Sequence, residues 1–269
     1  MTAALKIKPE FIDKLDDVQA SSDKRCIAIQ KVGIKDLTYP LVFIDKGVRQ
    51  QTKAFCNLYV SLAENQRGTH MSRFITLMNE HYKTFDIEKF NQLPEEVAKT
   101  LEAESSRIEL NFTYFRWKKA PISGLESAMD YNVFMTGEYV NGNVETTIKV
   151  EVPATSLCPC SKKISDYGAH NQRSMITITV KPKESIWLED IIVIAEQNAS
   201  AEVFGLLKRE DEKYLTEYAY ENPKFVEDMV RDVVLSLQKD ERIKGFVVEI
   251  ENFESIHNHS AYAMIDKMD

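Results

Sequence analysis

The sequence lacks long apolar runs and has few cysteines, and each absence excludes a class of protein. None of its hydrophobic stretches approaches the roughly 20 residues that a membrane-spanning helix requires. The segment from Met1 to Phe11 has no apolar stretch of the kind found in secretory signals. Four scattered cysteines do not make the disulfide framework that small secreted domains need. We therefore expect a cytoplasmic protein, in a reducing compartment, without a membrane partner.

Basic residues are fewer than acidic residues. The chain has 34 lysines and arginines against 42 aspartates and glutamates, which gives a formal net charge of −8. This balance argues against a general nucleic-acid-binding protein, so a phosphate-bearing ligand must be bound by a local group of cations. The remaining composition, 43% hydrophobic and 28% charged over 269 residues, is typical of a globular protein with one large domain or two of ordinary size.

Hydrophobic periodicity predicts a chain of alternating strands and helices. Alternation predicts strands at residues 37–45, 52–63, 107–118, 131–139, 144–152, 175–180 and 245–250. Helical spacing predicts helices from about residue 69, from 86 to 103 with an interruption near Pro94, from 187 to 204, and up to 237. The pair Asn222-Pro223 predicts the start of the last helix. A phase shift to Phe115 and Trp117 predicts a β-bulge.

The order of these elements predicts an α+β fold. The pair Asn141-Gly142 is the strongest hairpin signal in the chain, and the segment from Pro121 to Ser127 has the composition of a joint. Each half contains strands, two helices and then further strands, which predicts an antiparallel sheet with helices layered on one face. We expect an amino-terminal arm over residues 1–30, a first module over residues 31–120, and a second module over residues 121–269.

One loop of the second module, from Ser156 to Ser174, gathers residue types that bind metals and anions. It contains Cys158, Cys160, His170, Lys162, Lys163 and Arg173. Thiolate and imidazole are ligands for divalent metals, and neighbouring cations suit an anionic substrate. The loop offers three ligands at most, whereas a closed structural zinc site needs four, so the pattern favours an open, catalytic site. The alternative is that the thiols only pack and the histidine only satisfies a local hydrogen bond.

Three motifs give the chain a strong resemblance to the type IB GTP cyclohydrolases. The motifs are Gly-Thr-His-Met-Ser-Arg-Phe at Gly68–Phe74, Leu-Cys-Pro-Cys-Ser-Lys at Leu157–Lys162, and His-Asn-Gln-Arg-Ser at His170–Ser174. The resemblance covers residues 37–269. It implies a tunnelling fold with two ββααββ modules per chain, assembled as a homotetramer or another homo-oligomer with active sites at subunit interfaces.

The resemblance also implies an activity. Enzymes of that family are hydrolases that act on cyclic amidine C–N bonds, and they convert GTP and water to 7,8-dihydroneopterin triphosphate and formate, the first step of folate and pterin synthesis. GTP is then the substrate, and a divalent metal is the cofactor. Zinc suits thiolate, imidazole and carboxylate ligands best, with manganese and iron as alternatives.

Carried over by position, the resemblance implies Cys158, His170 and Glu212 as the metal ligands. Glu210 and Asp211 adjoin Glu212 in the sequence, so a small shift of the match would select another carboxylate. Three protein ligands would leave a position open for the water that attacks C8 of the guanine ring, and a metal lowers the pKa of such a water toward about 7.

Further residues are candidates for proton transfer and for guanine binding. The resemblance implies that His257 lies beside the metal, as an additional ligand or a proton-transfer group. His257 and His259 are candidates to donate protons to the ring nitrogens, because imidazole titrates near neutral pH. Glu227 matches the carboxylate that anchors the purine, and it would accept hydrogen bonds from the guanine edge. Cys160 has three open roles: contact with a metal ligand, proton transfer, or packing.

The triphosphate requires cations, and both modules contain candidates. The candidates are Lys162, Lys163 and Arg173 beside the metal loop, and Arg67, His70 and Arg73 in the first module. The first-module residues can reach the loop only if the modules or neighbouring subunits meet there.

Three alternatives remain open. An archaeal-type relative would make a cyclic phosphate of dihydroneopterin instead. A nitrile reductase of the same fold would need a Glu-Ser-Lys motif, but Lys183-Glu184-Ser185-Ile186 lacks the final lysine. A non-catalytic purine-binding assembly module would carry a structural metal and would bind GTP without turnover.

Overall fold

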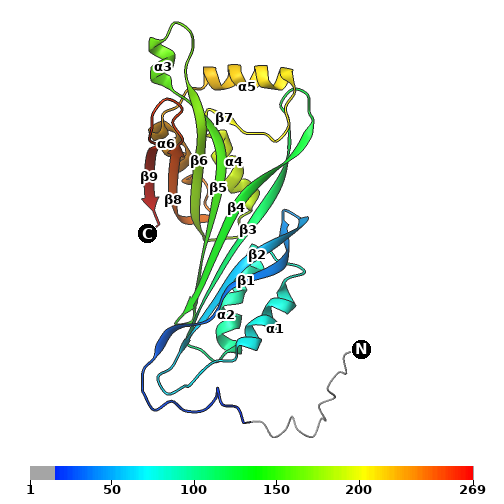
Figure 1. The fold of residues 1–269 in the computed structure, drawn as a ribbon, viewed down its shortest axis with the longest axis vertical. Coiled ribbons are helices and arrows are strands. Elements are labelled where there is room, and N and C mark those ends of the chain that lie inside the picture. Colours follow the sequence, from blue (N-terminus) through cyan, green and yellow to red (C-terminus); the bar gives the residue numbers. More distant parts are fainter. Residues whose placement is uncertain (1–15, 269) are drawn as a thin grey trace.

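A computed structural model describes residues 16–268, and one continuous antiparallel sheet dominates it (Figure 1). Eight strands follow the order β1-β2-β3-β4-β5-β6-β8-β9, and the two-residue strand β7 pairs with β5. Residues 1–15 of the expected amino-terminal arm lie outside the described residues.

The strands are long and the helices are short. The strands are β1 (Ile29–Asp45), β2 (Val48–Leu62), β3 (Ser105–Lys119), β4 (Glu126–Val140), β5 (Asn143–Leu157), β6 (Asn171–Pro182), β7 (Ala201–Glu202), β8 (Ile243–Asn252) and β9 (Ala261–Lys267). The helices are α1 (Met71–His81), α2 (Ile87–Thr100), α3 (Pro159–Ile164), α4 (Leu188–Gln197), α5 (Arg209–Glu221) and α6 (Val226–Leu237). None of the helices within residues 16–268 is long and apolar enough to cross a membrane.

Helices α1, α2, α4 and α6 cover one face of the sheet, which confirms the predicted α+β class (Figure 1). Alternate strand residues point toward these helices and form one core, in which Phe43, Phe74, Phe90 and Phe112 are almost fully buried. Gly137 of β4 allows α2 to approach closely, because a Cβ atom there would meet the Pro94 ring at 2.7 Å. The burial of these alternating apolar side chains is the main favourable term for such a layer.

The element order is doubled about the β4–β5 turn. Four strands and two helices precede this turn, and four long strands with α4 and α6 follow it. The turn is the predicted Asn141-Gly142 hairpin, and both residues have positive φ, 52° and 81°, as a two-residue hairpin turn requires. The expected boundary between the modules, after residue 120, lies in the turn between β3 and β4. It is therefore one hairpin before the β4–β5 turn about which the elements repeat.

The predicted β-bulge near Phe115 is wrong. Strand β3 pairs with β4 without a register shift, and the alternation continues, so that Arg116 and Lys118 point inward while Phe115 and Trp117 are exposed. The sequence pattern shifts because two cations occupy positions that face the helices. The strand does not shift with it, because a buried carboxylate on α4 neutralises these cations.

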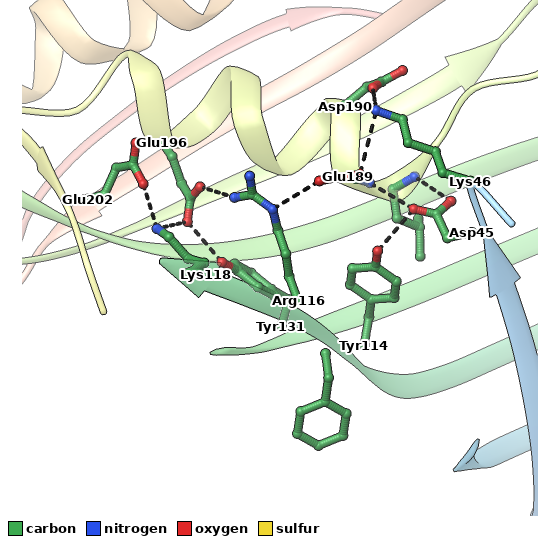
Figure 2. A network of polar contacts seen from close by, with 12 residues as sticks. Asp45, Lys46, Tyr114, Arg116, Lys118, Tyr131, Glu189, Asp190, Glu196 and Glu202 are labelled. Atoms are coloured by element: carbon green, nitrogen blue, oxygen red, sulfur yellow. Dashed lines mark hydrogen bonds and ion pairs between the residues drawn. The ribbon is translucent and has the colours of Figure 1, made fainter. Parts of the chain in front are cut away.

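That carboxylate belongs to Glu196, and Figure 2 shows its contacts. The Lys118 Nζ and Arg116 Nη1 atoms each lie 2.6 Å from a Glu196 oxygen, and the Tyr131 hydroxyl donates to Glu196 at 2.8 Å. The Lys118 and Glu196 side chains are only 3% and 2% exposed. Burial and the adjacent Glu196 carboxylate raise the pKa of Tyr131, so its hydroxyl remains a donor. Glu202 gives Lys118 a second carboxylate at 2.6 Å.

A second carboxylate from the first half caps the same helix. The Asp45 side chain, at the end of β1, accepts hydrogen bonds from the backbone amides of Leu188 and Glu189 in the first turn of α4, each at 3.1 Å (Figure 2). The Tyr114 hydroxyl also donates to it, at 3.1 Å. Burial raises the pKa of Asp45 despite these donors. The β1–β2 hairpin and α4, 143 residues apart in the sequence, are therefore joined by a helix cap.

Three helix predictions require correction. Helix α2 continues through Pro94 without an interruption. The helix expected from 187 to 204 ends at Gln197, because Asn198 caps it and the chain then enters β7. Asn222 does not begin the last helix: it caps the end of α5, and its side-chain amide donates to the carbonyls of Ala199 and Ser200. Helix α5 was not predicted, because its sequence is polar and buries little beyond Asp211 and Ala219.

The buried ion pairs predict a large effect of removing Glu196. We expect Glu196→Ala to reduce the free energy of unfolding by about 3–5 kcal/mol, because Lys118 and Arg116 would remain buried without a counter-charge. Denaturant titration would measure the loss. Glu126→Ala is the matched control, since Glu126 is exposed and lies 3.6 Å from Lys119; it should change stability by at most about 1 kcal/mol. Equal effects of the two substitutions would contradict the interpretation.

Candidate active site

The backbones of Cys158 and His170 lie next to each other at one end of the sheet. The Cys158 amide donates to the carbonyl of His170 at 3.1 Å, where β5 ends and β6 begins. Cys158 is the N-cap of α3, and its sulfur accepts from the Ser161 amide at 3.4 Å. The Ser161 hydroxyl accepts from the His170 amide at 3.3 Å. One serine thus holds the thiol and the imidazole segments together, and both side chains are half-buried.

The loop between β8 and β9 lies at the same end, because β8 ends beside the start of β6. His257 and His259 are exposed in this loop, and their rings stack with centroids 5.2 Å apart and an interplanar angle of 21°. Ser255, in the same loop, brings its hydroxyl to 3.4 Å from Nδ1 of His170. The two late histidines therefore point the same way from a loop that contacts His170.

Glu227 also lies at this end of the sheet. The Lys224 amide, just before α6, donates to the carbonyl of Leu157 at 3.1 Å, so α6 begins beside the end of β5. Glu227 is exposed in the first turn of α6. Residues 157–171, the first turn of α6 and the β8–β9 loop are called the Cys158 corner below. This part of the molecule contains Cys158, His170, His257, His259 and Glu227.

The cations of the loop have different surroundings. Lys162 donates to the carbonyl of Tyr220 at the end of α5, lies 4.2 Å from the Tyr220 ring centroid and pairs with Glu221 at 3.5 Å. Lys163 is exposed on α3, as is Cys160. Arg173 is exposed on β6, at the edge of a cleft of about 310 Å³ beneath α5.

Glu212 lies at the opposite end of α5 from the Cys158 corner. Tyr220, near the end of α5, contacts Lys162, and the helical rise puts Glu212 about 12 Å away along the axis. Glu212 is exposed in the first turn. Glu210 shares this exposure, so the structure leaves these two carboxylates free to contact another molecule.

Asp211 differs from both neighbours because it is fully buried. Its carboxylate accepts hydrogen bonds from the amides of Ile122, Ser123 and Lys208 at 2.8–2.9 Å, and from the Ser123 hydroxyl at 2.7 Å. Burial favours the neutral acid, but these donors outweigh it and hold the pKa of Asp211 below its usual range. A carboxylate with four donors has no capacity left for a metal, which removes Asp211 from the alternatives to Glu212.

The first-module candidates lie at the far end of the sheet (Figure 1). Strand β2 ends beside the start of β3 and the end of β4, whereas Cys158 follows the other end of β5. The 15 residues of β5 span about 45 Å, which is longer than a nucleoside triphosphate. There, His70 contacts Asp17 at 3.0 Å and Arg73 donates to the carbonyl of Thr100 at 3.0 Å; Arg67 is exposed nearby.

A single chain supplies part of the predicted ligand set. Within residues 16–268, no three cysteine, histidine, aspartate or glutamate side chains lie close enough together to hold a metal ion. The thiol of Cys158 and the imidazole of His170 have the donor chemistry of a zinc-type site, and they share one corner. The carboxylate of Glu212 does not reach that corner in its own chain.

Sequence reasoning missed the residues behind His170. The Gln172 carbonyl oxygen lies 3.0 Å from Nδ1 of His170, and its amide nitrogen donates to the Ser156 hydroxyl at 2.8 Å. Gln172 lies in the His-Asn-Gln-Arg-Ser motif, two residues after His170. In a strand that spacing puts both side chains on the same face, which is the signal that points to the contact.

Comparison with known proteins identifies close relatives. A protein-family model described as type I GTP cyclohydrolase folE2 matches residues 15–263. The chain is 54% identical over 253 residues to "GTP cyclohydrolase FolE2 2" of Dechloromonas aromatica (strain RCB), which covers 94% of each chain. It is 56% identical over 253 residues to "GTP cyclohydrolase FolE2" of Nitrosomonas eutropha (strain DSM 101675 / C91 / Nm57), with 93% of this chain and 95% of that one covered.

Solved structures with the same fold include two uricases. The uricase from Bacillus fastidious aligns with a TM-score of 0.53 at 9% identity, over 88% of this chain and 92% of that one. The uricase from Arthrobacter globiformis aligns with a TM-score of 0.50 at 8% identity, over 88% and 93%. At these identities the likeness shows the fold alone, and it confirms the predicted tunnelling fold.

The environment of Asp211 predicts a pH-dependent contribution to stability. A carboxylate whose pKa is lowered by folding stabilises the protein above its unfolded pKa of about 3.9, and this stabilisation is lost as the pH falls through the folded value. Asp211→Asn should therefore be less stable than the wild type at pH 7, and the difference should narrow below about pH 4. Denaturant titrations from pH 7 to pH 3 would measure it. The control Glu210→Gln should show a small difference at every pH; a pH-independent deficit for Asp211→Asn would contradict the assignment.

Proposed function

The chain belongs to the type I GTP cyclohydrolase family described as FolE2, and we propose that it converts GTP and water to 7,8-dihydroneopterin triphosphate and formate with a divalent metal at the Cys158 corner. Relatives more than half identical align with over nine-tenths of the chain, so GTP cyclohydrolase activity in folate synthesis follows from membership. The observation that carries the finer proposal is the backbone hydrogen bond between Cys158 and His170, which puts the two predicted ligands of the loop next to each other.

The metal-binding part of the proposal rests on donor chemistry. Cys158 and His170 would hold the ion, and Glu212 would complete the set; zinc suits these donors, with manganese or iron as alternatives. When bound, the metal would lower the pKa of a coordinated water so that it attacks C8 of guanine near neutral pH. The half-buried setting of both side chains supports this role, because it limits competition from bulk water while leaving the site reachable.

The remaining residues of the corner have chemistry that suits guanine. Glu227 would accept hydrogen bonds from the ring N–H and the exocyclic amine, a donor edge that adenine lacks. His257 and His259 would deliver protons to the ring nitrogens as the C–N bonds break, and their exposure in one loop allows them to reach a substrate at the corner. Cys160, exposed on α3, would be limited to an auxiliary role.

A second copy of the chain is required to complete this site. Glu212 would come from a neighbouring subunit, and so would Arg67, His70 and Arg73, which would join Lys162, Lys163 and Arg173 around the triphosphate. Two features support assembly of several chains: β1 and β9 are the two edge strands of the sheet, and apolar side chains are exposed around the Cys158 corner. The exposed side chains are Ile164, Tyr167, Phe225, Phe253 and Ile256.

Removal of the thiol tests the metal and the chemistry together. Cys158→Ala should lose bound metal and should reduce GTP turnover by a factor on the order of 10³ or more, while the fold survives, because the side chain is half-buried and not part of the core. Formate release, product mass and metal content would be measured on the same preparation. A cyclic phosphate as the product would refute the triphosphate assignment. GTP binding without turnover by the wild type, and loss of folded protein in the variant, would instead support a structural metal.

Mixing two inactive variants tests whether the site is shared between subunits. Cys158→Ala and Glu212→Ala, co-expressed with different tags and purified as hetero-oligomers, should recover activity, because one of the two sites at each mixed interface then combines an intact Cys158 with an intact Glu212. For a two-fold interface the recovery should be roughly half of the wild-type value.

The matched control combines Cys158→Ala with His170→Ala. Both residues belong to the same corner of one chain, so no interface would be intact and activity should stay absent. Absence of recovery in the first mixture, with hetero-oligomers verified by both tags, would show that Glu212 does not act across the interface.

A further inference from the structure

A buried polar pair lies directly behind the imidazole of His170. The inward positions of β6 from Ile176 onward are apolar, with Ile176, Ile178 and Val180 fully buried. The first two inward positions are polar: Gln172 is only 8% exposed, and Ser174 is fully buried and donates to Asn252. Its partner in β5, Ser156, is fully buried and is the residue directly opposite it in the strand register. Burial of an amide and a hydroxyl in a sheet core is unfavourable unless both are hydrogen-bonded, so this pair has a specific role.

The contacts of the pair are directed at one ring nitrogen. The Gln172 carbonyl oxygen lies 3.0 Å from Nδ1 of His170, while its amide nitrogen donates to the Ser156 hydroxyl at 2.8 Å. The exposed Ser255 hydroxyl is also nearest to Nδ1, at a longer 3.4 Å. Among the described residues, the hydrogen-bond contacts of the ring are therefore both at Nδ1.

An acceptor at Nδ1 determines the tautomer of a neutral imidazole. The ring carries one N–H, and a carbonyl oxygen at hydrogen-bond distance favours its location on Nδ1, which leaves the lone pair on Nε2. Only a nitrogen with a free lone pair can bind a metal. Metal-binding histidines commonly donate their other N–H to such a partner, which fixes both the tautomer and the direction of the ring.

We propose that Gln172, itself held by Ser156, is a positioning residue that keeps His170 in the Nδ1–H tautomer with Nε2 available to a divalent metal. This inference rests on the proposed function, in which His170 is a metal ligand. Gln172 does not touch the metal or the substrate; it acts through His170.

The tautomer can be observed without any metal. In metal-free protein labelled with ¹⁵N-histidine, long-range ¹H–¹⁵N spectra at alkaline pH should show the Nδ1–H pattern for His170, whose signals are identified by their loss in His170→Asn. Gln172→Met removes the acceptor at similar size and should move His170 toward the Nε2–H form, which is commoner in water. Gln172→Glu retains an acceptor oxygen and should keep the wild-type pattern. A wild-type proton on Nε2, as an amide turned the other way would produce, overturns the inference.

Metal affinity provides the second readout. Competition with a chelator for Zn²⁺ should show Gln172→Met weakened by roughly 10–100-fold, and Gln172→Glu within a few-fold of the wild type. Circular dichroism and thermal unfolding of the same samples verify that the Met variant is folded. If it is not, Ser156→Ala, which frees the amide to rotate, should weaken Zn²⁺ binding in the same direction.

The two proposals fail in different ways. Equal Zn²⁺ affinity of the wild type and folded Gln172→Met overturns the positioning role and leaves GTP hydrolysis untouched. A wild type that neither binds Zn²⁺, Mn²⁺ or Fe²⁺ nor converts GTP refutes the proposed function, and the positioning role with it. A wild type that binds metal, converts GTP and loses affinity only in Gln172→Met supports both.

Discussion

The position of α4 depends on a buried carboxylate that neutralises two cations from the other half of the chain. Glu196 binds Lys118 and Arg116 of β3, and Asp45 of β1 caps the first turn of the same helix. Removing one partner from such a group leaves a buried charge without compensation, so the contacts strongly favour one arrangement. The two halves of the chain are joined through α4 as well as through the sheet.

The end of α4 in turn supports the Cys158 corner. The Ser200 amide donates to the carbonyl of Thr155, and the Ser200 hydroxyl accepts from the amide of Leu157, the residue before Cys158. Asn222, at the end of α5, donates to the carbonyl of Ser200. The Cys158 corner therefore packs against the segment that follows α4, and the first half of the chain holds α4 in place. In this way the buried ion pairs of Glu196 support the proposed metal ligands from a distance.

The distribution of candidate residues is the basis for the proposal that the site combines more than one copy of the chain. The thiol of Cys158, the imidazole of His170 and the carboxylate of Glu227 lie at one end of a sheet whose strands reach about 45 Å, and the first-module cations lie at the other. A barrel built from several such sheets can bring opposite ends of different chains together. The exposed apolar side chains around the corner are consistent with that arrangement, since contiguous exposed apolar surface commonly marks an interface.

The sequence by itself determined the α+β class, seven of the nine strands in residues 16–268 and the family, because alternation, the Asn141-Gly142 turn and three short motifs are local signals. It also made candidates of Cys158 and His170, which lie at the two ends of the 13-residue connection between β5 and β6. Only the tertiary structure decided that Arg116 and Lys118 face inward without a bulge. It also decided that the Asp211 carboxylate is fully hydrogen-bonded inside the protein and is not available to a metal, and that Glu212 lies away from Cys158. These outcomes depend on partners 78 to 89 residues distant in the chain, and no local pattern encodes such pairings.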